Sequence, residues 1–319
     1  MNKKIFFVCL FVLGFFSTYL FANDNMRIFP KEQGEVITGF KTASLPEEVK
    51  ITIAYPEEYP LQAQKSFPLV FLFDTEEYSI EDLKQMYYQK ENKNPSALIA
   101  SFRFKNTNLS QEQFDNFIAE TFAFFEVNYR TESDPSKRLV LAANSMALLA
   151  LNLLNSQANY FLNLGMLLNN TTSLPVFDIP FRKAVRIFCF APKTNIVRLQ
   201  NLLEGTALKP MQNFFFKIQE NASFTAFDLR YFFSETAKIK QIKPIVKKEI
   251  LQEEPIYLQV KTNYGVLDFL PNQIYFAPPI LAYDNSSGLL KVLLPDQTKV
   301  KIKGVFAGKK WSKSVKILN

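Results

Sequence analysis

The chain has 319 residues, of which 48% are hydrophobic, 33 are phenylalanine and none is histidine. This length and apolar content suffice for a large core, which favours one α/β domain with an appended part. Because histidine is absent, the usual serine-histidine catalytic relay is excluded. The net charge of +7 is uneven: residues 235–319 hold 14 lysines, no arginine and 7 acidic residues, whereas residues 23–234 carry a net charge of −2.

Residues 1–22 are typical of an export signal. Lys3 and Lys4 precede an apolar run that ends at Leu20, and Phe21-Ala22 offers a cleavage point. The run is short and interrupted by serine and threonine, which favours cleavage over a retained anchor. We therefore expect a bacterial periplasmic protein. Secretion, or anchoring in the inner membrane by this segment, remains the alternative.

The cysteines exclude an intramolecular disulfide in the mature chain. Cys9 lies within the expected signal, so Cys189 is the only remaining thiol. Its apolar surroundings indicate a small core residue rather than a nucleophile. Without histidine or a cysteine pair, transition metals have no ligand set, and no calcium-loop motif occurs. We expect neither a metal nor another cofactor.

Residues 48–234 alternate strand and helix patterns, which predicts a mostly parallel sheet with helices on both faces. An N-terminal extension at 23–47 precedes this body. The predicted strands are 49–55, 67–74, 96–103, 138–143, 160–167, 184–190 and 213–218. The predicted helices are 111–125, 146–154, 194–204 and 224–233.

The remainder of the chain predicts a small antiparallel β-rich domain at 256–319, joined to the body by a charged linker at 235–255. The linker assignment rests on five lysines and two prolines. Turn residues separate the predicted strands at 256–262, 273–277, 280–283, 289–294, 300–306 and 314–318.

The lysines of residues 235–319 alternate with apolar residues, which favours solvated strand faces. A basic surface could also contact nucleic acid, an anionic membrane or an acidic protein. Arginine, the residue most used to read phosphates and bases, is absent there, and an exported protein meets little nucleic acid. We expect protein partners in the envelope and no nucleic acid. Membrane contact is expected only through a retained signal or this basic surface.

The body resembles esterases of the α/β-hydrolase fold, of the esterase D and enterochelin-esterase type. Residues 51–56 and 67–74 look like the opening strand pair of that family. Tyr129-Arg-Thr131 looks like the segment that precedes the nucleophile strand, and Arg138 to Leu149 looks like the nucleophile elbow. The resemblance covers about residues 45–234 and implies an α/β-hydrolase-like fold.

The elbow motif of the family, Gly-x-Ser-x-Gly, stands here as Ala143-Asn144-Ser145-Met146-Ala147. The serine is retained, and both glycines carry an added methyl group. A serine between a strand and a helix can also serve as a helix cap, so Ser145 alone does not establish a nucleophile.

At the other functional positions implied by the resemblance, this chain has residues that differ from the catalytic residues of the family. Thr75 stands where the family has the glycine of its oxyanion loop, and Asn195 lies in the loop that should supply the acid. Ala222 or Ser223 occupies the place of the histidine. Lys193 is the one nearby base that could assist Ser145, although a solvated, protonated lysine is the simpler interpretation.

Loss of the histidine base costs a serine triad about a million-fold in turnover. The sequence therefore predicts a catalytically inactive esterase-like protein with a degenerate site at Ser145, Asn144, Met146, Thr75, Asn195 and Ala222. Its expected role is a scaffold or interaction subunit of an envelope assembly such as a secretion or flagellar structure. A weak serine hydrolase that uses Ser145 with another base, or a small-ligand binding protein, are the alternatives.

Overall fold

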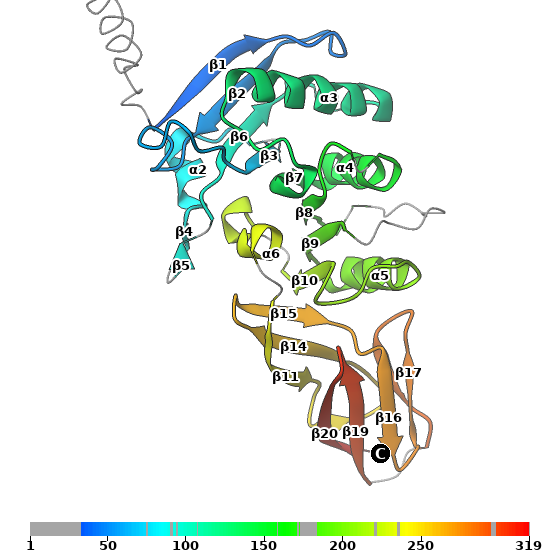
Figure 1. Ribbon diagram of the computed structural model, residues 1–319. Coiled ribbons are helices and arrows are strands. Elements are labelled where there is room, and N and C mark those ends of the chain that lie inside the picture. The colour runs from blue at the N-terminus through cyan, green and yellow to red at the C-terminus, as the bar shows by residue number, and fades with distance from the viewer. Residues whose placement is uncertain are drawn as a thin grey trace, which may run out of the picture.

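The computed structural model describes residues 33–318 except 75, 90–91, 94, 107, 158, 171, 173–183, 220–221, 235–236 and 295–297. It contains an α/β-hydrolase-like body with a large, mostly parallel sheet, followed by a β-rich C-terminal module (Figure 1). The predicted fold class is confirmed. No helix in the described part of the chain is long and apolar enough to cross a membrane. The expected signal at 1–22 lies outside the described residues.

The body contains an eight-stranded sheet in the order β1-β2-β6-β3-β7-β8-β9-β10. Its strands are β1 (Gly34–Phe40), β2 (Val49–Ala54), β3 (Leu69–Phe73), β6 (Leu98–Arg103), β7 (Arg138–Ala143), β8 (Asn163–Leu167), β9 (Arg186–Ala191) and β10 (Phe214–Ile218). The pairs β1–β2 and β2–β6 are antiparallel, and the strands from β6 to β10 run parallel. All five residues of β3 are buried, as the continuous apolar run predicted, because helices cover both faces of the sheet. Strand β1 comes from the expected N-terminal extension, so the sheet begins earlier than the predicted body.

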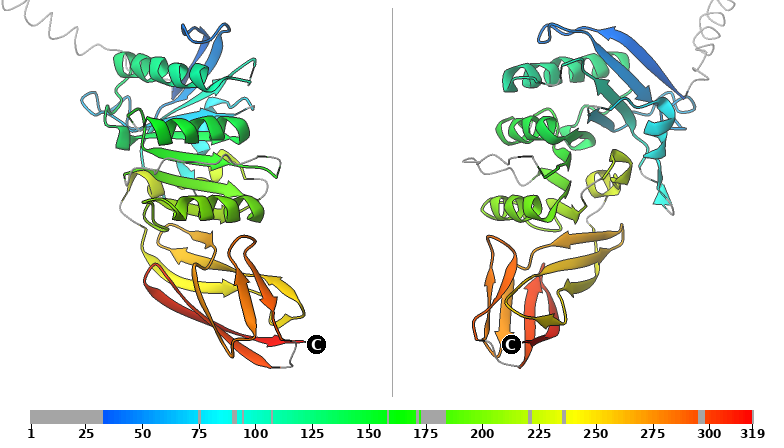
Figure 2. Two further views of the ribbon diagram at one scale, coloured as in Figure 1. Left: turned by 90° about the vertical axis from the view of Figure 1, so that its right-hand side faces the viewer. Right: turned by 180° about the vertical axis from the view of Figure 1, so that it is seen from behind.

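Helices α3, α4 and α5 cover one face of the sheet, and α2 and α6 lie on the other (Figures 1 and 2). The helical segments are α2 (Ile80–Gln85), α3 (Gln111–Asn128), η1 (Pro135–Lys137), α4 (Asn144–Ser156), α5 (Lys193–Glu204), η2 (Phe224–Ala226) and α6 (Arg230–Phe233). The predicted helix 224–233 is thus divided in two. Between the two segments, the Asp228 carboxylate accepts a hydrogen bond from the Arg230 amide at 3.0 Å, as in an Asx turn. A short hairpin, β4 (Tyr88–Gln89) and β5 (Asn92–Lys93), follows α2.

The C-terminal module contains three small sheets, ordered β11-β14-β15, β12-β20-β19-β16 and β13-β18-β17. Its strands are β11 (Ile239–Ile245), β12 (Glu249–Ile250), β13 (Glu253–Pro255), β14 (Tyr257–Thr262), β15 (Val266–Phe269), β16 (Gln273–Ala277), β17 (Leu281–Asp284), β18 (Leu289–Val292), β19 (Lys299–Phe306) and β20 (Lys309–Ile317). All pairs are antiparallel except β12–β20. The segment expected as a charged linker contains β11, β12 and β13. Lys240 and Lys243 are exposed residues of β11, which pairs with β14 along its length, so these lysines mark strand positions rather than a loop.

The module is fixed to the body at the end of the large sheet. Phe269 of β15 packs against Phe214 and Phe216 of β10, with ring centroids 6.4 and 5.8 Å apart. The Gln200 side chain of α5 accepts from the Leu270 amide at 2.8 Å and donates to the Leu270 carbonyl at 3.1 Å. The buried residues of both parts form one continuous core.

Candidate functional site

A pocket of about 410 Å³ lies where several strands of the large sheet reach their carboxyl ends. In open α/β sheets, ligands bind at this edge. Residues at or just beyond the carboxyl ends of β3, β7, β8, β9 and β10 line it: Asp74, Glu76, Tyr78, Ala143, Asn144, Leu167, Leu168, Asn169, Phe190, Gln219, Ala222 and Ser223. Of the residues that the sequence singled out, this group includes Ala143, Asn144, Ala222 and Ser223.

The strained residue at the turn between β7 and α4 is Asn144. Its φ is +48°, in the left-handed region that asparagine tolerates better than most residues. A nucleophile elbow requires such a sharp turn, because the turn projects one side chain toward the site. Here that side chain is an amide. The elbow therefore lies one residue earlier than the motif centred on Ser145 implied.

Ser145 is the second residue of α4, is exposed, and is not among the described residues that line the pocket. The helix cap is Ala143, so Ser145 does not occupy the capping position either. Met146 and Ala147 are buried against the core. Thr75, the expected oxyanion-loop position, lies outside the described residues.

Three asparagines from successive strand ends are hydrogen-bonded to one another. The Asn144 Oδ1 accepts from the Asn169 amide at 3.1 Å, and the Thr172 hydroxyl lies 3.3 Å from the same oxygen and 2.8 Å from Asn169 Oδ1. Asn195 Nδ2 donates to the Asn169 carbonyl at 2.6 Å. Amides neither release nor take up protons near neutral pH, so this network orients groups without transferring a proton.

Asn195 is therefore a positioning residue in the first turn of α5, and its side chain is buried. The sequence placed Asn195 where the family has its acid, and in the structure its side chain bonds to the backbone of Asn169. Asn169 itself was missed. A lone asparagine just beyond a strand is common in loops, so the sequence offered no signal for it.

The loop after β3 brings acidic groups to the pocket. Asp74 accepts a hydrogen bond from the Tyr78 hydroxyl at 2.7 Å, and Glu76 lies beside it in the pocket wall. Burial, followed by the hydrogen bond to Asp74, raises the pKa of the Tyr78 hydroxyl well above its ordinary value. An oxyanion hole needs donors directed at a developing negative charge. Carboxylates at this place disfavour such a charge.

The loop after β10, where the family has its histidine, contributes Gln219, Ala222 and Ser223 to the pocket. The methyl group of Ala222 offers no acid or base. The Ser223 hydroxyl lies 2.6 Å from the Thr225 hydroxyl, a contact within the same loop.

Lys193, the first residue of α5, is not among the described residues that line the pocket. Its side chain is directed at the C-terminal module, where its Cε lies 3.8 Å from the position that a Cβ on Gly288 would take. Burial lowers the pKa of Lys193, and the charge of Glu254 partly opposes that effect. Lys193 thus follows β9 as expected, but its side chain lies against the C-terminal module and not in the pocket wall.

Cys189 is fully buried in β9, and burial raises the pKa of its thiol far above the ordinary value. The interpretation of Cys189 as a core residue is confirmed. Among the described residues, no group of three or more cysteine, aspartate or glutamate side chains could hold a metal ion.

The Tyr-Arg-Thr segment serves the structure of the body. The Arg130 guanidinium lies 4.0 Å from the Tyr59 ring centroid and donates to the Tyr59 and Gln62 carbonyls. The Tyr129 hydroxyl donates to the carboxylate of Glu35 in β1. These contacts hold the first strand and the segment after α3 together at a distance from the pocket residues.

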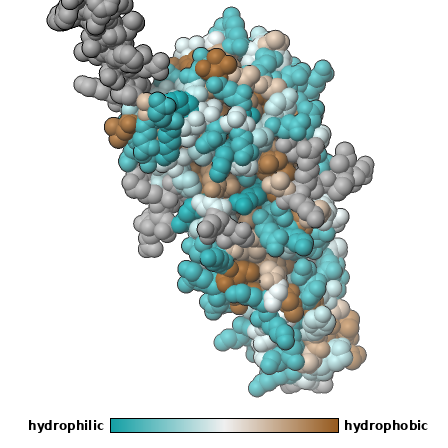
Figure 3. All heavy atoms as spheres, in the orientation of Figure 1, coloured by the Kyte–Doolittle hydropathy of each residue, from teal (hydrophilic) through white to brown (hydrophobic). Residues whose placement is uncertain are grey.

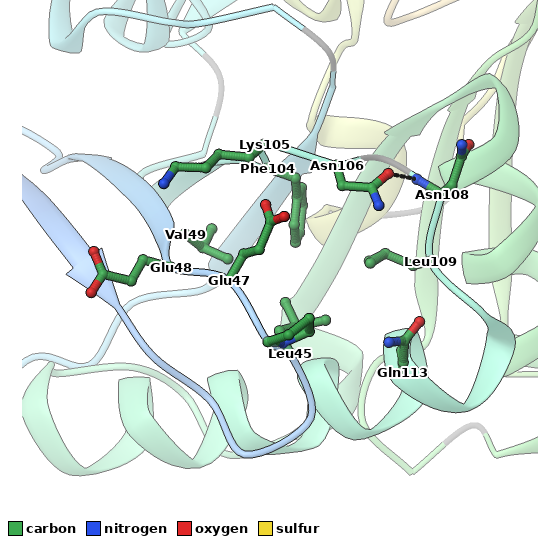
Figure 4. Close-up of a pocket in the computed structure, with 11 residues that line it drawn as sticks. Leu45, Glu47, Glu48, Val49, Phe104, Lys105, Asn106, Asn108, Leu109 and Gln113 are labelled. Carbon is green, nitrogen blue, oxygen red and sulfur yellow. Dashed lines mark hydrogen bonds between the residues drawn. The ribbon is translucent and has the colours of Figure 1, made fainter.

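A second pocket lies between residues 45–49 and the segment that leads from β6 into α3 (Figure 4). Its volume of about 50 Å³ holds only a few water molecules. Phe104 and Leu109 give it an apolar wall, and the Asn108 amide donates to Asn106 Oδ1 at 2.9 Å on its rim. This cavity is too small for an ester substrate or a cofactor.

No family model and no curated protein matches the sequence. Solved structures with a similar fold include a ferulic acid esterase, with 12% identity, a TM-score of 0.46, and coverage of 63% of this chain and 95% of that chain. The enterobactin esterase of Shigella flexneri has 13% identity, a TM-score of 0.47, and coverage of 60% and 55%. S-formylglutathione hydrolase of Staphylococcus aureus has 8% identity, a TM-score of 0.43, and coverage of 59% and 92%.

Proposed function

We propose that this protein is a catalytically inactive member of the esterase-like α/β hydrolases and acts as a scaffold or protein-interaction subunit in the bacterial envelope. The observation that carries the proposal is the amide of Asn144 at the strained turn, where an esterase presents its nucleophile. An amide nitrogen or oxygen does not form an acyl intermediate in this chemistry.

The absence of a base supports the same proposal. The chain has no histidine, and the hydrogen-bond partners of the Asn144 side chain are the Asn169 backbone amide and the Thr172 hydroxyl, neither of which is a base. Removal of the histidine alone from a serine triad lowers turnover by about a million-fold, equivalent to about 8 kcal/mol of transition-state stabilisation. Replacement of nucleophile, acid and base together leaves only binding.

A weak hydrolase that uses Ser145 is the competing function. The exposed position of Ser145 outside the pocket and the direction of Lys193 toward Gly288 argue against it. A serine hydroxyl without a base within hydrogen-bond reach is a poor nucleophile.

Reaction with an active-site-directed fluorophosphonate tests the inactive state. We expect no stoichiometric labelling of the purified mature protein and no hydrolysis of short-chain aryl esters above the rate in buffer, with an active serine esterase as positive control. The variants Ser145→Ala and Asn144→Ser should behave in the same way, because neither supplies a base. Labelling of the wild type that disappears in Ser145→Ala would establish a serine hydrolase instead.

The scaffold role is supported by the export-signal pattern at 1–22 and by the presence of an esterase-like fold in a chain without histidine. Crosslinking in the native cells followed by mass spectrometry tests it. We expect a reproducible set of envelope proteins to be crosslinked to this chain. Consistent recovery of the chain without crosslinked proteins would contradict the scaffold role.

Binding of a small molecule is a second candidate function, because the pocket of about 410 Å³ falls within the range of about 300–1,000 Å³ typical of ligand sites. A ligand of this pocket should raise the melting temperature in a saturable manner. The variant Asn144→Leu, which removes an amide from the wall, should abolish that increase.

A further inference from the structure

Strands β16, β19 and β20 expose a face that carries five lysines. Cross-strand neighbours on this face include Tyr275 and Lys303, Val305 and Lys310, and Lys299 and Lys316. We call this surface the lysine face and define it by the exposed side chains of Tyr275, Lys299, Lys301, Lys303, Lys310 and Lys316.

The charges of the lysine face are not neutralised within the described part of the chain. None of its five lysines takes part in the ion pairs found among the described residues. One acidic residue, Glu249 of β12, stands opposite Lys316 at the margin. Ordinary solvated surfaces mix both signs of charge, so a simple solubility role does not account for this face.

The arrangement of the lysines costs stability. Lys299 and Lys316 are direct cross-strand partners, and like charges in that relation destabilise a sheet. Local arrangements that oppose folding are expected mainly where they serve another function. The lysine face is therefore a candidate for binding a negatively charged partner.

The shape of the face suits a broad partner rather than a single small anion. A shallow hollow of about 510 Å³ is lined by Tyr275, Lys301, Lys303 and Lys310, and 61% of Tyr275 is exposed. Lysine ammonium groups act as point charges, whereas discrete phosphates or carboxylates are usually held by the two-pronged arginine guanidinium. The module has no arginine at all.

Exposed apolar side chains lie directly after β18, in the neighbouring sheet β13-β18-β17 of the module. Leu293 and Leu294 are 57% and 61% exposed, and the Leu293 amide donates to the Ile280 carbonyl at 2.9 Å, three residues beyond the end of β16. Figure 3 shows apolar surface at this end of the module next to hydrophilic surface. An exposed tyrosine, lysines and adjacent leucines together are typical of surfaces that contact the membrane interface.

We propose that the lysine face binds the surface of a membrane that contains anionic phospholipids. Attraction between the lysine charges and the lipid headgroups provides most of the affinity, with Tyr275, Leu293 and Leu294 in contact with the interface. This role goes beyond the proposed function of the body and is independent of whether the pocket is catalytic.

Vesicle flotation tests the proposal, and it uses the whole protein in the form in which it is isolated from cells. We expect binding to vesicles of equimolar phosphatidylcholine and phosphatidylglycerol, little binding to phosphatidylcholine alone, and a decrease with added salt. The triple variant Lys301→Glu, Lys303→Glu, Lys310→Glu should lower the ratio of bound to free protein by roughly ten-fold or more.

The matched control is the triple variant Lys65→Glu, Lys105→Glu, Lys209→Glu, which changes the net charge equally at exposed sites of the body. It should retain binding. An equal loss in this control, equal binding to both kinds of vesicle, or undiminished binding of the first variant would overturn the proposal. So would retention by immobilised polyglutamate without any vesicle binding, which would indicate an acidic protein partner. Thermal unfolding establishes that each variant is folded, and Lys301→Gln, Lys303→Gln, Lys310→Gln replaces the first variant if it is not.

Discussion

At the scale of single residues, the decisive feature is the backbone of Asn144. The left-handed conformation costs a residue with a Cβ about 1–2 kcal/mol unless its side chain finds local hydrogen bonds, and Asn144 Oδ1 has two potential donors. The side chain thus compensates for the strain of the turn, which explains an asparagine at a place where the fold requires a sharp bend.

Replacement of Asn144 separates these two effects. Asn144→Gly keeps the left-handed backbone but loses the hydrogen bonds, so we expect a loss of about 1 kcal/mol in the free energy of unfolding. Asn144→Val adds a β-branched side chain at positive φ and should lose about 3 kcal/mol. Urea denaturation measures both, and equal losses would show that backbone strain is unimportant here.

The sequence alone excludes a histidine base at this site, because the chain contains no histidine. It did not reveal the position of the elbow, since φ depends on how β7 leads into α4. Ser145 was the predicted nucleophile position because it carries the only hydroxyl in the motif. In the structure Ser145 is exposed and is not among the described residues that line the pocket. The role of Asn169 depends on neighbours that are distant in sequence and could not be predicted.

At the scale of elements, long apolar runs were located well and polar strands were missed. Strand β7 was predicted to its exact bounds because both ends of the apolar run carry polar or turn residues. Strand β11 was missed because its exposed residues are Lys240, Gln241 and Lys243, its buried residue is a proline, and a register shift interrupts the period of two. Charge density was therefore a poor guide to loops in this chain.

The turn between β17 and β18 provides a pH-dependent test at this scale. Asp284 accepts hydrogen bonds from the Ser286 amide, the Ser286 hydroxyl and the Ser287 hydroxyl, which together hold its carboxyl pKa well below the usual range. The stabilisation from this lowered pKa is complete above the unfolded-state pKa of about 3.9 and is lost as the pH falls through the folded-state pKa.

The variant Asp284→Asn should therefore melt at a lower temperature than the wild type at pH 7. The difference should shrink as the pH is lowered below about 4, because the Asp284 carboxyl of the unfolded chain then takes up a proton before that of the folded protein does. A series of thermal melts from neutral to acidic pH measures it. A difference that stays constant across the series would mean that the ionised form is not what stabilises the turn.

At the scale of the whole molecule, the body and the C-terminal module share one core, so we expect them to unfold together. Phe269 lies at the junction, with its ring centroid 5.8 Å from that of Phe216 and 4.8 Å from that of Phe306. Phe269→Ala should reduce the free energy of unfolding by about 3–5 kcal/mol in a single transition. Calorimetry measures this, with the exposed Tyr275→Ala as a nearly neutral control. Two separate transitions, of which only one moves in Phe269→Ala, would show that the parts fold independently.

The junction also has a consequence for solubility. Strand β10 is the terminal strand of the large sheet, and its outward edge is occupied by the module: the Ile218 amide donates to Asp268 Oδ2 at 3.0 Å, and Phe214 and Phe216 face Phe269. An uncovered edge of this kind would offer unpaired backbone groups and apolar rings to the strands of other molecules. The C-terminal module thus protects the body from edge-to-edge aggregation, and a chain cut after Ser234 would lose that protection even with every residue of the pocket in place.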